Sequence, residues 1–319
     1  MIDYTVLYKR VLPVNDNWPE EVRWKVFISA YTEAARVQRV FEKVSADSRH
    51  WLVLPEYGFR GDELPPGNAF VAETRHEGEC IARFWETLGT LGPTGSICID
   101  ITGFVRPYLI FLIRWLMEQG ITVFDAIYSE PVRYAKRELT QFSGERIAEV
   151  RQVAGFEGVH GTDTSNDVLI IGSGYDHQLI AHAAQSKDNA RKLQIFGFPS
   201  LRADMYQENV LRAQQAEEAV GWRTGDQANS FFASAYDPFM TAHVLRGIVS
   251  AQNSRKPVTN LYLCPLSTKP MVLGFALYYV TERLNGPTSI VFPFSSSYAR
   301  ETSKGLSRIW LYRVELPRT

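Results

Sequence analysis

Short apolar segments alternate with helix-forming segments along most of the chain, and this rhythm constrains the fold more than any other feature. Residues 26–29 and 51–55 are short and apolar, which predicts two strands. Residues 33–44 lie between them and predict a helix, because apolar side chains recur there at helical spacing. A strand, a helix and a strand within about thirty residues match the size of one βαβ unit. The recurring apolar residues are Val37, Val40, Phe41 and Val44.

The same order of elements returns several times. Residues 96–100 predict a strand, residues 102–119 predict a helix that Gly120 closes, and residues 121–128 predict the next strand. Parallel neighbours in a sheet need a crossover, which is usually a helix. The alternation therefore predicts a Rossmann-like α/β fold, with a mainly parallel sheet flanked by helices. Later strands are expected at 167–171, 193–196, 231–235, 260–264, 290–292 and 309–314, and later helices at 177–186, 205–220, 240–251 and 271–284.

The run from residue 160 to residue 166 is the most polar, loop-like stretch of the chain. It separates two parts with a similar rhythm. We therefore expect an N-terminal α/β half at 1–160 and a C-terminal α/β half at 167–319, or one continuous domain of the same residues.

Individual strands can be placed within the predicted sheet. Residues 97–100, 168–171 and 261–264 are short continuous apolar runs, typical of strands that are covered on both faces, so we expect them in the interior. Residues 308–316 alternate charged and apolar side chains, which predicts a half-exposed edge strand.

Composition excludes several classes of protein. The 319 residues carry a net charge of −1, with Lys and Arg scattered, so we expect no extended nucleic-acid-binding surface. The three cysteines are far apart, which argues against a disulfide framework and favours a reducing compartment. No signal-peptide pattern is present, and the most apolar run, 108–117, is about half the length that crosses a bilayer. We expect a cytoplasmic protein that does not enter a membrane.

Ligands of open parallel sheets bind beyond the carboxyl ends of the strands, and one loop stands out at such an end. Gly172, Ser173, Gly174, Tyr175 and Asp176 follow a predicted strand and open a predicted helix. Glycines in this context let backbone N–H groups approach a phosphate. The sequence lacks a complete dinucleotide or P-loop motif, so a tight turn with Asp176 as the helix cap is the alternative.

Other strand ends carry further candidates. Thr268 and Lys269 open the helix after residues 260–264, where Lys269 would meet an anionic ligand together with helix N-terminal amides. Ser200 ends the loop after residues 193–196. Asp100 and Thr102 follow another strand, where Asp100 either caps a helix or binds a ligand, and Glu130 lies at a similar position.

The sequence does not indicate a metal site or name a cofactor. His177 and His182 are five residues apart, which does not match the spacing of metal ligands on one helical face. If the chain is an enzyme, the candidates for acid or base are Asp100, Glu130 and Asp176, and we expect Asp100 and Asp176 to face one cleft.

Three short segments resemble a known group of domains. They are Ile99–Asp–Ile–Thr102 before a helix, Tyr128–Ser–Glu–Pro131, and Pro265–Leu–Ser–Thr–Lys–Pro270. Together they resemble the Rossmann-like sensor domains of bacterial antiviral defence, such as the CRISPR-associated Rossmann-like group. The resemblance implies recognition of a nucleotide-type signal, with Thr102, Ser173 and Lys269 at the matching positions.

Three hypotheses follow from the sequence. The first is a Rossmann-like protein that binds a nucleotide or other phosphorylated small molecule, as a sensor. The second is a hydrolase or a glycosyl-bond-cleaving enzyme that acts on a nucleotide. The third is an interaction subunit whose loops contact a protein partner, which would expose a large apolar patch.

Overall fold

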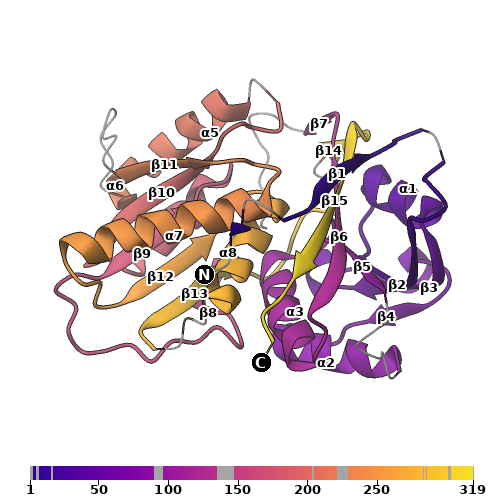
Figure 1. The fold of residues 1–319 in the computed structure, drawn as a ribbon, viewed down its shortest axis with the longest axis horizontal. Helices are drawn as coiled ribbons and strands as arrows, with labels where there is room; N and C mark the ends of the chain where they lie inside the picture. Colours follow the sequence, from indigo (N-terminus) through magenta and orange to yellow (C-terminus); the bar gives the residue numbers. More distant parts are fainter. Residues whose placement is uncertain are drawn as a thin grey trace. The chain divides into compact units, whose positions relative to one another are not determined.

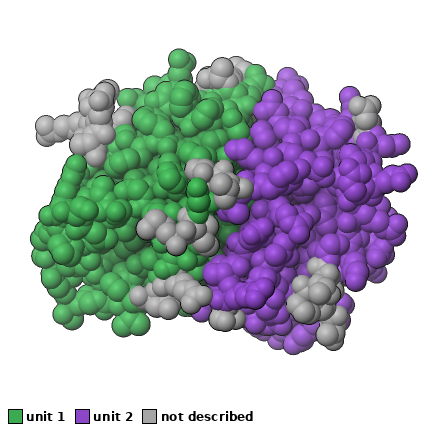
Figure 2. Space-filling model, in the orientation of Figure 1, with its two compact units in different colours: residues 1–6, 145–295 green, residues 7–144, 296–319 purple. Residues whose placement is uncertain are grey.

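The computed structural model of the chain divides into two compact units (Figure 2). Unit 1 comprises Met1–Val6 and Glu145–Ser295, and unit 2 comprises Leu7–Gly144 and Ser296–Thr319. Each unit is built around a sheet of its own. The structure describes residues 3–4, 7–15, 17–89, 96–134, 147–202, 205–220, 229–282, 284, 286–300 and 303–318.

Strand pairing sets the division between the units. Strand β8 (Ile147–Gln152) precedes the polar loop at 160–166, yet it pairs with β13 (Thr288–Ser295) in unit 1. Strand β15 (Arg308–Glu315), near the end of the chain, pairs with β6 (Val123–Glu130) in unit 2. The loop that the sequence predicted as a boundary therefore lies inside unit 1, because a polar loop can join two strands of one sheet.

Within the described residues, unit 1 forms a six-stranded sheet in the order β11-β10-β9-β12-β13-β8. All neighbours are parallel except β13 and β8. The central strands β9 (Val168–Gly172) and β12 (Leu261–Pro265) are buried at every residue, as expected of strands covered on both faces. Strand β10 (Arg191–Gly197) lies beside β9, and β11 (Ser230–Ala233) lies beyond β10 at the edge of the sheet.

The helices of unit 1 form two groups (Figure 1). Helix α7 (Pro238–Arg255) packs against α8 (Lys269–Thr281), whereas α4 (His177–Gln185) packs against α5 (Met205–Gln214) and α6 (Glu217–Val220). The chain leaves β9 through α4 toward β10 and leaves β12 through α8 toward β13, in opposite directions along the sheet. Because such crossovers are right-handed, α4 and α8 cover opposite faces.

Unit 2 forms a seven-stranded sheet within the described residues, in the order β1-β15-β6-β5-β2-β3-β4. The five strands from β6 to β4 are parallel, and β15 is antiparallel to both of its neighbours. A separate antiparallel pair joins β7 (Arg133–Tyr134) and β14 (Ser303–Lys304). The other strands are β1 (Lys9–Leu12), β2 (Arg23–Ala30), β3 (Ser45–Val53), β4 (Ala69–Val71) and β5 (Ile97–Asp100).

The helices of unit 2 follow the same logic. Helix α1 (Ala35–Lys43) joins β2 to β3, while α2 (Glu77–Thr87) and α3 (Arg106–Glu118) pack together and lead to β5 and β6. The chain therefore leaves β2 and β5 in opposite directions. The apolar face of α1 buries Val40 in a cluster with Phe27 of β2 and other sheet residues. Two short 3-10 turns, Pro55–Tyr57 and Gly61–Glu63, connect β3 to β4.

The α/β, Rossmann-like fold class is confirmed, with mostly parallel sheets and helices on their faces. The interior placement of residues 97–100, 168–171 and 261–264 is also confirmed, in β5, β9 and β12. The prediction of an edge strand at 308–316 is wrong, because β1 pairs with β15 and covers it. The alternation there reflects one partly exposed face of the sheet.

No helix among the residues that the structure describes combines the length and the apolar character that a membrane span needs.

Candidate functional site

Each sheet has a switch point, where two neighbouring strands send the chain in opposite directions and leave a crevice at their carboxyl ends. In unit 1 this point lies between β9 and β12, where Gly172 is paired with Pro265. The predicted ligand loop, Gly172–Asp176, and the loop before Lys269 are therefore neighbours. In unit 2 the switch point lies between β2 and β5, where Ser29 is paired with Asp100.

Gly174, in the loop after β9, lets this loop pack closely against the loop after β12. A Cβ atom on Gly174 would lie 2.2 Å from the carbonyl oxygen of Leu266, and the Leu266 amide donates to the carbonyl of Gly172 over 2.9 Å. Gly174 is buried. Asp176 caps α4, with its Oδ1 accepting from the amide of Leu179 at 3.2 Å. The alternative of a tight turn with an Asp cap therefore describes the local structure of this loop.

Ser173 fixes the loop to the strand and helix beside it. Its hydroxyl donates to Oε1 of Gln194 on β10 at 2.7 Å, and its carbonyl accepts from Nδ2 of Asn209 on α5 at 3.1 Å. Tyr175 also reaches α5, donating from its hydroxyl to the carbonyl of Met205 at 3.1 Å. The loop is thus held on two sides by hydrogen bonds.

Three buried polar atoms of unit 1 have no hydrogen-bond partner among the described residues. They are Nε2 of Gln194, Oδ1 of Asn209 and Oγ of Ser234, on residues that are 1%, 6% and 9% exposed. A buried polar group without a partner costs about 1–3 kcal/mol, so such groups are rare in folded proteins. The set contains an amide donor, a carbonyl acceptor and a hydroxyl, which suits a polar organic ligand.

The start of α8 lies beside one of these atoms. Thr268 precedes the helix but makes no side-chain bond to its first turn, because its hydroxyl donates to the carbonyl of Ala235 at 2.5 Å. Ser234 immediately precedes Ala235 in the chain. Lys269 is the first residue of α8 and is half-buried. The start of α8 therefore contacts the residue that follows Ser234.

Aromatic side chains occupy the same edge of the sheet, beyond β10 and β11. Phe198 and Phe232 are 53% and 47% exposed, and Tyr206 of α5 contacts both, with ring centroids 5.2 and 6.0 Å away. The loop that carries Phe198 is bound to the next strand, since the Phe198 amide donates to the Ala233 carbonyl at 2.7 Å. In this loop, the Ser200 hydroxyl donates to the carbonyl of Arg202.

At the switch point of unit 2 the polar side chains bond to one another, whereas Oε2 of Glu56, which follows β3 at the same edge, is buried without a partner among the described residues. Asp100 is fully buried, and its two carboxylate oxygens accept from the Ser29 hydroxyl at 3.1 Å and the Thr102 amide at 3.0 Å. Thr102 also shares a hydrogen bond with the Ser129 hydroxyl at 3.1 Å and accepts from the Ser129 amide at 3.0 Å. Arg36 of α1 donates to the carbonyl of Ser129 and, at 3.0 Å, to the hydroxyl of Ser303.

Burial raises the pKa of Asp100, while hydrogen bonds from Thr102 and Ser29 and the nearby Arg36 charge act in the opposite direction. Glu130 behaves in the same way: burial raises its pKa, and the indole N–H of Trp310, which donates to its Oε1 at 2.5 Å, lowers it. A raised pKa means that charging the carboxylate costs free energy in the folded protein, and these donors offset part of that cost.

The structure separates the predicted site residues into two sets. The candidates Gly172 to Asp176, Ser200, Thr268 and Lys269 come together at the carboxyl edge of the unit 1 sheet. Asp100, Thr102 and Glu130 belong to unit 2. Asp100 and Asp176 therefore lie in different sheets, and the single sheet edge on which their predicted common cleft rested does not exist.

Sequence reasoning missed Gln194, Ser234 and Arg36. A signal for Gln194 was present, because it is one polar residue inside the apolar run of β10, and Ser29 shows the same pattern in β2. Arg36 gave no signal, because an arginine on a helix is usually exposed.

Among the described residues, no three His, Cys, Asp or Glu side chains are grouped as metal ligands would be. No model of a known protein family matches the chain, and no curated protein matches it significantly.

Proposed function

We propose that this protein binds a nucleotide or another phosphorylated small molecule at the carboxyl edge of the unit 1 sheet. The observation that carries the proposal is the set of three unpartnered buried polar atoms of unit 1, on Gln194 of β10, Asn209 of α5 and Ser234 after β11. A ligand that supplied the missing hydrogen bonds would recover the free energy that these groups lose on burial.

The start of α8 supports a phosphate as the anionic part of the ligand. The hydroxyl of its N-cap residue, Thr268, donates to the Ala235 carbonyl and makes no hydrogen bond to the first turn of the helix. A phosphate at this end would accept hydrogen bonds from backbone N–H groups and would be attracted by the helix dipole and by Lys269. The Ser234 hydroxyl would donate to the same group.

The exposed aromatic side chains support a base as the other part of the ligand. Phe198, Tyr206 and Phe232 form a contiguous group on the loop after β10, on α5 and on β11. A nucleobase that stacks on an aromatic ring gains about 1–3 kcal/mol by alanine substitution in single-strand binding proteins. A nucleotide with its phosphate at the start of α8 and its base against Phe198 would extend from the end of β12 to the end of β10.

A sensor of bacterial antiviral defence is the biological role that the resemblance suggests. Of its matching positions, Ser173 and Lys269 flank the switch point of unit 1, whereas Thr102 lies in unit 2 and bonds to Ser129. Our proposal therefore rests on Ser173 and Lys269. A partner protein that receives the signal is part of this role.

The enzyme hypothesis is separable from binding. It assigns acid–base work to Asp100, Glu130 or Asp176, and each of these carboxylates accepts a hydrogen bond from its own unit. Chromatography of the bound nucleotide after incubation measures turnover directly, and Asp100→Asn would lower an Asp100-dependent rate by about 10²–10⁴.

Calorimetry with AMP, ADP, ATP, GTP and NAD, preceded by native mass spectrometry for a co-purified molecule, tests the proposal. We expect Lys269→Gln to weaken the binding of the best nucleotide about ten- to hundredfold, because a charge-assisted contact is worth about 1.5–3 kcal/mol. Phe198→Ala should weaken it about five- to hundredfold. Lys256→Gln is the matched control, since Lys256 is exposed and follows the carboxyl end of α7.

Two results would contradict the proposal. One is that no nucleotide binds. The other is that the Lys269→Gln and Lys256→Gln variants bind the nucleotide with the same affinity. If Lys269→Gln instead disrupts a complex with a protein partner, the interaction-subunit hypothesis replaces ours.

A further inference from the structure

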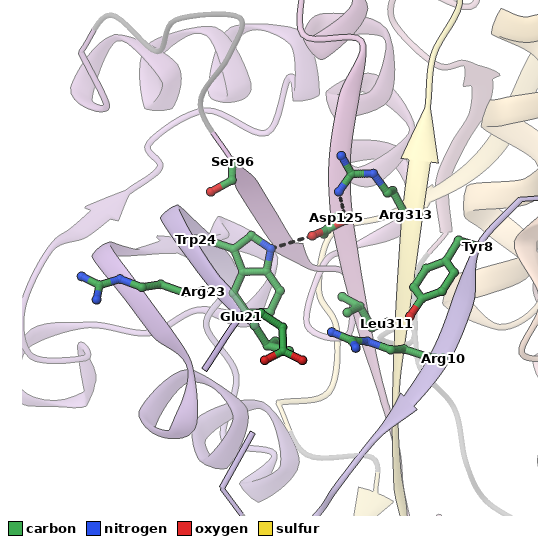
Figure 3. A pocket seen from close by; sticks show the side chains of 10 residues that line it. Tyr8, Arg10, Glu21, Arg23, Trp24, Ser96, Asp125, Leu311 and Arg313 are labelled. Atoms are coloured by element: carbon green, nitrogen blue, oxygen red, sulfur yellow. Dashed lines mark hydrogen bonds and ion pairs between the residues drawn. The ribbon is translucent and has the colours of Figure 1, made fainter. Parts of the chain in front are cut away.

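Unit 2 contains a cavity of about 240 Å³ at the amino ends of its parallel strands, the end away from the switch point (Figure 3). Strand register explains why polar groups gather there. Arg313 of β15 is paired with Asp125 of β6, and two residues further along the strands Leu311 is paired with Arg10 of β1. Paired residues and residues two apart share one face of a sheet, so these four side chains line the same face.

Most of the charges that line this cavity are already matched. Arg23 forms an ion pair with Asp47 at 2.7 Å and is directed away from the centre of the cavity in Figure 3. Asp125 accepts from the indole N–H of Trp24 at 2.7 Å and lies 3.7 Å from a guanidinium nitrogen of Arg313. These contacts hold the back of the cavity in place without leaving a net charge there.

Arg10 and Glu21 also line the cavity, and they carry opposite charges that form no ion pair within the described part of the chain. Arg10 is half-buried, and its enclosed Nε has no hydrogen-bond partner among the described residues. Its guanidinium forms no ion pair within the described part of the chain, and neither does the exposed carboxylate of Glu21. An enclosed guanidinium N–H without an acceptor is costly, so a ligand that accepts from it would be stabilised.

The remaining walls are apolar or aromatic. Trp24 and Leu311 are 3% and 4% exposed, and Tyr8, which precedes β1, is 50% exposed. Figure 3 shows Trp24 and Leu311 between the Asp125 side of the cavity and the side that holds Arg10 and Glu21. The volume lies below the range of about 300–1,000 Å³ that drug-sized ligands occupy, so the occupant must be small.

We propose that this cavity binds a small zwitterion of the amino-acid class. Its carboxylate would accept from Arg10, its ammonium would face Glu21, and its apolar side chain would lie against Trp24 and Leu311. A dianion such as phosphate fits less well, because Glu21 and Asp125 would repel its second charge. The site involves none of the residues of the nucleotide proposal.

Calorimetry with four related compounds tests this assignment. L-phenylalanine and L-leucine carry both charges, 3-phenylpropionate lacks the ammonium, and phenethylamine lacks the carboxylate. We expect an amino acid to bind, and each analogue that lacks a charge to bind at least tenfold more weakly than L-phenylalanine. Arg10→Gln and Glu21→Gln should each weaken amino-acid binding about ten- to hundredfold, since each removes one charged partner.

Arg23→Gln is the control, because it removes an arginine of the same cavity that is already paired with Asp47. It should change the affinity less than twofold, as should Lys269→Gln in unit 1. Thermal melting of each variant checks folding, and Glu21→Gln decides if Arg10→Gln unfolds, since Glu21 is exposed. Absence of binding by every amino acid at 10 mM would overturn the proposal. So would equal binding of 3-phenylpropionate and L-phenylalanine with no effect of Glu21→Gln.

Discussion

The two switch points are built alike but differ in how their polar groups are satisfied. Both bring a glycine against a backbone carbonyl of the neighbouring strand or its loop: Gly103 against Ala30 in unit 2 and Gly174 against Leu266 in unit 1. In unit 2 the polar side chains at this edge bond to one another, from Ser29 to Asp100 and from Thr102 to Ser129. In unit 1 three buried polar atoms have no partner among the described residues, and in unit 2 one has none at this edge, Oε2 of Glu56 after β3.

This difference shows which of two similar edges is suited to a ligand. Polar residues at the carboxyl ends of strands are common to both units and do not distinguish them. What distinguishes them is hydrogen bonding: a closed network is stable on its own, whereas unpartnered buried groups lower stability until a ligand supplies the missing bonds. A buried polar network that is incomplete within the protein is thus the better guide to a binding site.

The largest loss of stability is expected from substitutions of Gly103 and Gly174, which pack in the same way at the two edges. A Cβ atom on residue 103 would lie 2.1 Å from the Ala30 oxygen, and one on residue 174 would lie 2.2 Å from the Leu266 oxygen. Because backbone must move in both cases, Gly103→Ala and Gly174→Ala should each lower the free energy of unfolding by about 3 kcal/mol or more. Urea denaturation followed by circular dichroism measures this.

Gly247→Ala provides the control, because Gly247 lies within α7 and no atom lies within 4 Å of its added Cβ. This substitution should stabilise the protein by about 0.5–1 kcal/mol through the higher helix propensity of alanine. If Gly174→Ala is as well tolerated as Gly247→Ala, the close packing of the two loops is wrong.

A smaller effect should differ in sign between the edges. Ser129→Ala removes a hydroxyl that bonds to Thr102, so it should lower the free energy of unfolding by about 1 kcal/mol. Ser234→Ala removes a buried hydroxyl without a described partner, so it should raise that free energy by up to about 1 kcal/mol. Urea midpoints at unchanged m-values give both quantities. Equal losses in the two variants would mean that Ser234 is satisfied like Ser129.

The fold could be predicted from sequence because apolar periodicity reports local structure directly. Residues 168–171 and 261–264 are continuous apolar runs, and both form central strands. The division into units could not be predicted, because it depends on the pairing of β15 with β6 and of β13 with β8. Such pairing joins segments that are far apart in the chain. The residues of β1 show no apolar pattern that predicts the edge strand of the unit 2 sheet.

The candidate site was predicted in part for the same reason. The loops at 172–176 and 266–269 could be found because each follows an apolar strand and opens a helix. That they are neighbours depends on strand order, which the sequence does not state. Asp100 was also a candidate, either as a helix cap or as a ligand contact, and only the structure shows that its carboxylate bonds to Ser29 and Thr102.

Hydrogen–deuterium exchange with and without a saturating nucleotide compares the two edges in one experiment. We predict that the nucleotide slows exchange in residues 173–180 and 266–272 of unit 1. The corresponding segments of unit 2, residues 30–38 and 101–109, should exchange at the same rate in both samples. Protection of the unit 2 segments without protection of the unit 1 segments would contradict the account, because the ligand would then occupy the edge whose switch-point side chains already bond to one another.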